Sequence, residues 1–397
     1  TGEPITIATQ DIVVGCYYIS IYRDGVKGEG KRFGSEGEAM LAHEFDIVGL
    51  QAKIQVKISK FYEGKEKPLI ETSVGRIIFN EKLPEDFPYI NKELTRKALE
   101  QIFSEIIKKY KDPETIISIF DGVKGLGFEY ATRSGVSWGL NDLRIPEDKP
   151  QIIAEAEELV EAIKKQYQNG FLSGKERYNR ILNVWYDVMK KIEKRVPDII
   201  DPHGSVKLMI ASGARGSWSQ PIQMAGMKGL VVNPSGKVIE LPIKSSFKEG
   251  FNVLEYFIST HGARKGTADT ALRTASAGYL TRRLVDVSQD MVIKEIDCGD
   301  TRGTIIYRED CKETGQSFAL RVLSRVLIED LIIGGKEGGV KASAGAIIDK
   351  EMAKLIEAAD IQSIRLRSVL SCKAKDGICA HCYGYDLGSN RLVELGE

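Results

Sequence analysis

The sequence has no excess of either charge, few cysteines and no long apolar run. Lys and Arg together number 56, as do Asp and Glu, so any surface that attracts nucleic acid must be local. No apolar run reaches the roughly 20 residues of a bilayer span, and the N-terminus lacks the basic and apolar segments of a secretory signal. These absences argue against a membrane or exported protein. With 42% hydrophobic and 28% charged residues, the composition favours a soluble, globular chain.

Six cysteines in 397 residues, without an export signal, are too few for a disulfide framework. Three of them have a C-x6-C-x2-C spacing: Cys372, Cys379 and Cys382. A C-x2-C pair is the usual knuckle of a tetrahedral zinc site, although reduced, metal-free cysteines remain an alternative on spacing alone. Cys298 is the best candidate for the fourth ligand. His381 competes with it, but lies between two ligands and would strain the loop. Cys16 and Cys311 are expected to be plain thiols.

The hydrophobic pattern predicts a multidomain α+β protein. Residues 1–90 are expected to be mostly β, because Pro4 to Tyr22 alternates around Gly15 and residues 48–58 alternate as well. Helical spacing follows over residues 91–122. Two amphipathic stretches within 145–195, joined by a Gly-containing turn, predict an antiparallel helical hairpin. Its charged flanks favour projection into solvent, while an ordinary helix pair packed on a core stays open.

Downstream of the hairpin, the pattern predicts short strands, one long helix and then mixed elements. Residues 205–250 are rich in Gly and Ser, with a hairpin turn at Asn233–Gly236. Asn252 to Asp290 has no proline and predicts a single helix. Its three internal glycines each cost about 1 kcal/mol relative to Ala.

A stripe of small and hydroxyl side chains runs along this helix: Thr267, Thr270, Thr274, Ala277 and Thr281, with Ala271, Ala275 and Gly278 beside it. Such a face lets another body approach the backbone closely, and nearby arginines suit phosphates. Packing against other helices through small residues explains the stripe equally well from the pattern alone.

The helix resembles the bridge helix of the bacterial RNA polymerase beta-prime family. The resemblance is carried by Tyr256–Gly266, Ala268–Leu272 and Gly278–Asp286. It extends over nearly the whole chain, through Gln10–Asp11, Glu176–Asn179, Ser212–Ser217, Ala225–Met227 and the cysteine cluster. The resemblance implies five parts. They are 1–144, an active-site-barrel remnant and pore region; 145–204, a rim-helix hairpin; 205–250, a funnel and active-site loop region; 251–290, the bridge helix; and 291–397, a zinc-binding cleft region that ends before the trigger loop.

The resemblance also implies roles for particular residues. Thr274 and Ala275 would lie against the template base with Tyr279 nearby, and Arg215 would contact the triphosphate of the incoming nucleotide. From pattern alone, the loop that carries Arg215 is equally a plain surface turn. Cys298 would complete a structural Zn²⁺ site with the three clustered cysteines. The chain departs from the family at Gln220–Gln223, where the family often has an arginine.

By resemblance the function is DNA-templated RNA synthesis. The partners would be DNA, RNA, nucleoside triphosphates, the beta, alpha, omega and sigma subunits, and secondary-channel factors on the rim helices, in the cytoplasm at the nucleoid. The family holds catalytic Mg²⁺ with an Asp-x-Asp-x-Asp motif, but no two aspartates here lie two residues apart. With Thr1 as first residue, the chain is expected to be an internal piece, inactive alone. A zinc-stabilised docking scaffold and a naturally split subunit remain alternatives.

Overall fold

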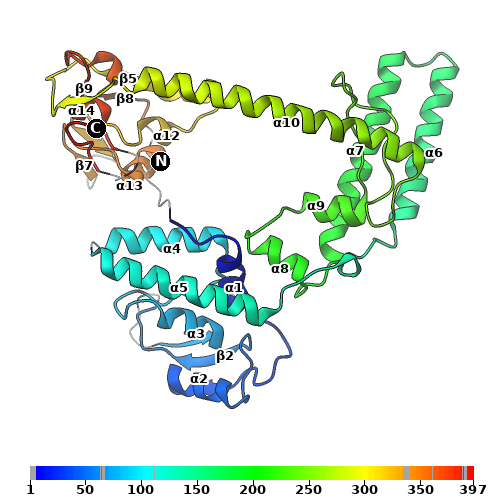
Figure 1. Ribbon diagram of the computed structural model, residues 1–397, viewed down its shortest axis with the longest axis horizontal. Coiled ribbons are helices and arrows are strands. Elements are labelled where there is room, and N and C mark those ends of the chain that lie inside the picture. The colour runs from blue at the N-terminus through cyan, green and yellow to red at the C-terminus, as the bar shows by residue number, and fades with distance from the viewer. Residues whose placement is uncertain are drawn as a thin grey trace. The chain divides into compact units, whose positions relative to one another are not determined.

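The computed structural model describes residues 6–62, 64, 68–110, 112–333, 340–359, 361–386, 388 and 391–397. It is a mixed α+β structure with small sheets, which confirms the predicted fold class. The chain divides into two compact units, one over Pro4–Asp269 and the other over Thr270–Glu397. The division falls inside the longest helix, α10 (Figure 1). A helix that could cross a lipid bilayer is absent from the described part of the chain.

Helices outweigh strands in the first 144 residues, and the prediction that residues 1–90 are mostly β is wrong. The helices are α1 (Asp11–Ser20), α2 (Glu36–Glu44), α3 (Val74–Glu81), α4 (Arg96–Lys109), α5 (Pro113–Ser134) and η1 (Leu140–Asp142). The strands are β1 (Arg32–Phe33), β2 (Ile54–Lys57) and β3 (Leu69–Thr72), in that order, with β1 parallel and β3 antiparallel to β2. Ile54, Val56 and Ile58 are buried on one face, as the alternation predicts.

Helix α1 replaces the strand expected over Pro4 to Tyr22, of which Pro4 and Ile5 lie outside the described residues. Its Val13, Cys16 and Ile19 are fully buried, which is a helical spacing. A Cβ on Gly15 would clash with the carbonyl oxygen of Gly127 in α5, so the two helices touch through glycine. The apolar residues of this segment therefore form a helix that is buried on several sides.

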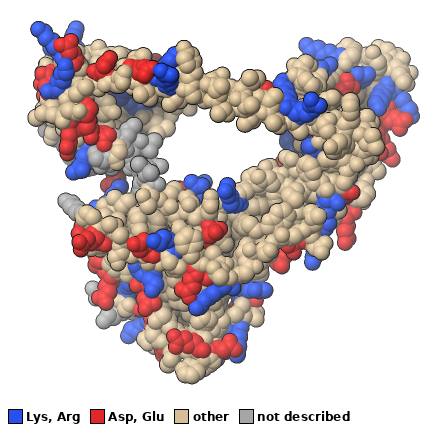
Figure 2. Space-filling view, viewed as in Figure 1, with Lys and Arg blue, Asp and Glu red and all other residues tan. Residues whose placement is uncertain are grey.

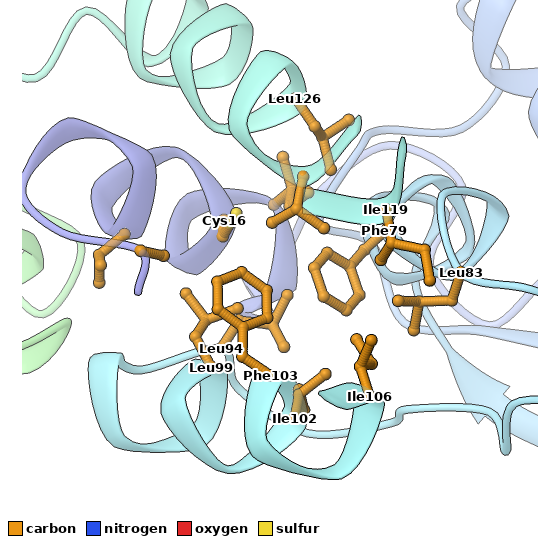
Figure 3. Packing of buried hydrophobic residues seen from close by; sticks show 14 of the residues in the cluster. Cys16, Phe79, Leu83, Leu94, Leu99, Ile102, Phe103, Ile106, Ile119 and Leu126 are labelled. Carbon is orange, nitrogen blue, oxygen red and sulfur yellow. The ribbon is translucent and has the colours of Figure 1, made fainter. Parts of the chain in front are cut away.

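The core of this region lies between α1, α3, α4 and α5 (Figure 3). Phe103 stacks on Phe120 with ring centroids 4.4 Å apart. Cys16 is buried within the core, and burial raises the pKa of its thiol to about 12. It is a plain buried thiol, as expected.

The helical hairpin forms as predicted, from α6 (Lys149–Gln168) and α7 (Gly174–Ile199). Ser173 caps α7: its hydroxyl accepts from the Glu176 N–H at 3.2 Å, while the Glu176 carboxylate accepts from the Ser173 N–H at 2.9 Å. The apolar seam of the hairpin is buried: Ala156, Val160, Ile181, Trp185, Val188 and Ile192.

Short elements lead from the hairpin to the long helix: α8 (Ser205–Ala211), α9 (Ser219–Pro221) and η2 (Ile222–Gly226). Two isolated bridges, Gly229 with Ile243 and Val232 with Val238, flank the predicted turn at Asn233–Gly236. Gly236 has a φ of 91°, a conformation that favours glycine. Helix α10 (Val253–Ser288) then runs for 36 residues, which confirms the single long helix.

The second unit holds three two-stranded sheets among its described residues. Parallel β4 (Ile293–Glu295) and β9 (Ile378–Cys379) form one of them. The other two are antiparallel: β5 (Thr304–Tyr307) with β8 (Ser363–Leu366), and β6 (Leu331–Ile333) with β7 (Val340–Ala342). The helices are α11 (Arg308–Thr314), α12 (Phe318–Val322), α13 (Lys350–Ala358), η3 (Val369–Ser371) and α14 (Ala380–Tyr383). Cys311 is buried in the core of this unit.

Candidate metal centre and nucleic-acid face

Four cysteine sulfurs come together in the second unit: Cys298, Cys372, Cys379 and Cys382. All four sulfur atoms lie within 4.8 Å of one another. The Sγ atoms of Cys298 and Cys382 are 3.7 Å apart. A tetrahedral zinc with Zn–S bonds of about 2.3 Å holds its sulfurs about 3.8 Å apart, so this donor set fits such an ion.

Strand pairing explains how a distant cysteine reaches the knuckle. Glu295 in β4 pairs with Cys379 in β9, which delivers the loop after β4 to the C-x2-C segment. Gly377 immediately precedes β9 with a φ of 155°, and a Cβ there would clash with the carbonyl oxygen of Val292. Glycine is therefore required where the two segments meet.

Backbone N–H groups point at the sulfurs. The N–H of Cys379 donates to Cys372 Sγ at 3.4 Å, and the N–H of Cys382 donates to Cys379 Sγ at 3.3 Å. Burial raises the pKa of the Cys298 thiol, but N–H groups of Lys373 and Asp300 that donate to the sulfur outweigh it and lower that pKa to about 7. At Cys298 these donors favour the thiolate, the form that binds metal, whereas burial raises the pKa of the Cys379 and Cys382 thiols.

His381 is not part of the cluster. Its Nδ1 lies 3.6 Å from Asp297 Oδ2, and its backbone N–H donates to the carbonyl oxygen of Ile296. Of the two candidates for the fourth ligand, the structure brings Cys298 to the other three.

The candidate template-facing residues of α10, Thr274, Ala275 and Tyr279, are all exposed. The Thr274 hydroxyl donates to the carbonyl oxygen of Thr270 at 2.8 Å, and Thr281 bonds back to Ala277 in the same way at 2.9 Å. Because these hydroxyls are satisfied within the helix, the stripe can contact another surface without seeking a polar partner. In the view of Figure 2, the middle of α10 is largely uncharged and charged side chains gather toward its ends.

The glycines of α10 are open as well. A Cβ on Gly262, Gly266 or Gly278 would have no atom within 4 Å. Large apolar side chains are exposed on the same helix, with Leu272 70% exposed and Leu284 61% exposed. A helix with small and large apolar groups in solvent is typical of an element that another macromolecule covers.

Arg215 lies in the loop after α8, between Gly213 and Gly216, whose φ angles of 73° and 80° favour glycine. Its side chain is exposed, and its guanidinium has no hydrogen bond or ion pair within the described ranges. It borders a cavity of about 170 Å³ that is also lined by Trp138 and Met224.

Comparison with known proteins places all of these elements in one family. Three family models match consecutive segments of the chain: RNA polymerase Rpb1 domain 3 at residues 1–143, domain 4 at 151–248 and domain 5 at 250–397. The chain belongs to the RNA polymerase Rpb1 family.

Individual relatives agree along the full chain. It is 42% identical to the DNA-directed RNA polymerase subunit beta' of Thermoanaerobacter pseudethanolicus, 41% to that of Roseiflexus castenholzii and 44% to that of Desulforamulus reducens. Each alignment covers 100% of this chain and 34%, 29% and 33% of the respective relative. The chain thus spans about a third of the length of the relatives it matches. Within Rpb1 domain 5 lie both α10 and the four cysteines.

Sequence reasoning missed the groups that anchor the start of α10 in this Rpb1 family member. The Glu255 carboxylate accepts from the N–H of Lys244 at 2.9 Å and from the Ser245 hydroxyl at 2.8 Å, and the Glu255 N–H donates to Asn252 Oδ1 at 2.8 Å. The Asn-x-x-Glu spacing is a capping-box signal that could have marked this helix start. An ion pair between the buried Lys149 and the partly exposed Glu249 ties the preceding loop to α6.

Sequence reasoning also missed Arg367, which follows β8 and reaches the metal centre. Its Nη2 donates to Asp297 Oδ1 at 2.7 Å, and its Nη1 lies 3.9 Å from Cys298 Sγ. No pattern in the chain relates an arginine here to a cysteine so far upstream.

Proposed function

We propose that this chain forms part of the largest catalytic subunit of a bacterial DNA-directed RNA polymerase and acts in DNA-templated RNA synthesis. The observation that carries the proposal is the consecutive match of three Rpb1 domains, with beta' subunits aligned over the entire chain. Its partners would be the beta, alpha, omega and sigma subunits with DNA and RNA, in the cytoplasm at the nucleoid. The catalytic Mg²⁺ would be held by another part of the subunit.

Within that assembly, α10 would be the bridge helix that contacts the template. Thr274 and Ala275 would lie against the template base, with Tyr279 beside them. The exposed stripe and the internally bonded hydroxyls support this role, because only small side chains without unmet polar groups allow such close approach. Arg215 would contact the triphosphate, which suits an exposed guanidinium that has no partner among the described residues.

The hairpin of α6 and α7 would rim the channel through which nucleotides enter and would dock secondary-channel factors. Its tip is ordered by the Ser173 capping box and exposes Phe171, which is 78% exposed. Exposed aromatic groups on a rigid helix end are typical of a protein-binding site. The five-part division of the chain, with this hairpin at 145–204, remains a prediction.

The metal that fits the cysteine cluster best is a structural Zn²⁺. An all-sulfur donor set of four thiolates suits zinc or an iron–sulfur centre, and the C-x2-C knuckle is typical of zinc. Cys298, Cys372, Cys379 and Cys382 would leave no open position. The ion would therefore cross-link the loop after β4 to the segment around β9.

A chimeric subunit tests the proposed function. The segment of the Thermoanaerobacter pseudethanolicus beta' subunit that aligns with this chain is replaced by residues 1–397, and the polymerase is reconstituted. We expect template-dependent RNA synthesis from the chimera, and none when the segment is deleted. An assembled chimera that binds DNA but makes no RNA would contradict the proposal and favour a docking scaffold.

A further inference from the structure

A guanidinium lies beside the cysteine cluster, outside the four proposed ligands. Arg367 follows directly after β8, where its backbone N–H donates to the carbonyl oxygen of Val326 at 2.9 Å. Its side chain is only 10% exposed, and its Nη1 lies 3.9 Å from Cys298 Sγ. A planar guanidinium can serve two acceptors at once, since its N–H groups point in fixed directions.

The second acceptor is Asp297, the neighbour of Cys298. Asp297 Oδ1 accepts from Arg367 Nη2 at 2.7 Å and from the N–H of Gly299 at 2.9 Å. The Asp297 carboxylate thus accepts one hydrogen bond from within the turn that carries Cys298 and one from Arg367 outside it. Arg367 thereby fixes this turn from outside, although the turn lies far from the other three ligands along the chain.

Charge gives Arg367 a further effect. Four thiolates around a divalent ion carry a net charge of −2, which is costly to hold in a partly buried site without compensation. Among the described residues, Arg367 is the cationic side chain that contacts a cluster sulfur. His381 faces Asp297 instead, and Lys373 lies 3.8 Å from Asp300.

We propose that Arg367 is a positioning residue of the metal centre, which donates to the Cys298 sulfur, offsets the charge of the thiolates and slows loss of the ion. This proposal rests on the proposed structural zinc. Groups that orient metal ligands from outside typically change metal affinity about 10- to 100-fold when they are removed. The thiolate of Cys298 would otherwise be the ligand held least firmly, because a separate loop supplies it.

The test uses the full chain and begins with its zinc content after dialysis. Zinc release to a chromophoric chelator is then timed for the unchanged chain, for Arg367→Met and for Arg365→Met. Arg365 is the matched control, because it lies two residues away in β8 and pairs with Glu329 on the surface. We expect release about 10-fold faster or more from Arg367→Met and an unchanged rate from Arg365→Met.

Two further measurements separate electrostatic positioning from a purely structural role. In the cobalt-substituted chain, the thiolate-to-cobalt charge-transfer band should shift in Arg367→Met and not in Arg365→Met. Arg367→Lys keeps the charge but cannot serve both Cys298 and Asp297, so its zinc should leave at an intermediate rate. If Arg367→Met does not fold, the rate of zinc release from Arg367→Lys decides the test instead.

The outcomes are distinguishable. Release at the rate of the unchanged chain from Arg367→Met, or from Arg367→Lys where the first variant does not fold, overturns the role of Arg367 and leaves the zinc proposal standing. An unchanged chain that holds no zinc overturns both.

Discussion

The hairpin and α10 are both long helical elements, yet they differ in where their apolar side chains lie. In the hairpin, Trp185 and Ile192 are 3% and 1% exposed. In α10, Leu272 and Tyr279 are 70% and 63% exposed. The hairpin therefore gains its stability from contacts within the chain, whereas the apolar side chains of α10 remain exposed and available to a partner. The difference separates apolar side chains that stabilise the fold from apolar side chains that stay exposed in this chain.

Metal removal should have the largest effect on stability. It applies to the second unit, where a metal ion is expected to stabilise the fold. We expect one zinc per chain and its loss in Cys379→Ser, because a missing thiolate breaks the closed site. Structural zinc contributes on the order of 10 kcal/mol to the folding of small domains, so chelation should unfold the region around β4 and β9. Metal analysis and circular dichroism measure both effects.

Cys311→Ser is the matched control for that experiment. Cys311 is buried in the same unit but lies outside the cluster, so this variant should keep its zinc. Zinc retained at full stoichiometry in Cys379→Ser would contradict the assignment.

Truncation of buried and exposed apolar groups tests the comparison itself. Trp185→Ala should lower the free energy of unfolding by about 3–5 kcal/mol, because it leaves a cavity in the hairpin seam. Leu272→Ala in α10 should change it by less than about 0.5 kcal/mol, since the side chain is already in solvent. Denaturant unfolding of the chain measures both values.

Tyr186→Ala controls for loss of an aromatic group from α7, because Tyr186 is 43% exposed. An equal loss of stability in Leu272→Ala and Trp185→Ala would break the distinction between the two elements.

A smaller effect is expected at the start of α10, where Glu255 is buried among hydrogen-bond donors. Burial raises the pKa of this carboxyl, but donors from Ser245, Asn252 and Lys244 outweigh it and lower the pKa below its ordinary value of 4.5. Its ionised form therefore stabilises the fold above about pH 4.5, and this contribution is lost as the pH falls through the lowered pKa.

Glu255→Gln should lower the free energy of unfolding by about 1 kcal/mol at neutral pH. It should also weaken the loss of stability at acidic pH, the acid limb of the curve of stability against pH. Glu158→Gln, at an exposed position of α6, is the control and should leave the curve unchanged. Chemical unfolding from pH 3 to pH 7 gives the comparison. An acid limb as steep in Glu255→Gln as in the unchanged chain would rule out this carboxyl as its source.

Local patterns were sufficient for the helical hairpin, for α10 and for part of the metal centre. The hairpin seam follows helical spacing, and the cysteine knuckle follows ligand spacing, so neighbours in the chain carried the information. The prediction failed at α1, because burial of Val13 and Ile19 depends on α5, more than 100 residues downstream. Arg367 was missed for the same reason, since its contact with Cys298 depends on the pairing of β8, which it follows, with the distant strand β5.

The measurement that tests the central claim most directly is RNA elongation by reconstituted polymerase that carries Ala275→Leu. We expect this enzyme to assemble and bind DNA normally but to extend RNA on the order of 100-fold more slowly, because displacement of the template by about 1 Å is enough for such a loss. Helix stability should change by less than about 1 kcal/mol, because Leu is nearly as good a helix former as Ala. Ser276→Leu, about 100° round the helix from Ala275 and about 200° from Thr274, controls for added bulk. Normal elongation by Ala275→Leu with stability lowered by about 1–3 kcal/mol through overpacking would show instead that the stripe is packed core.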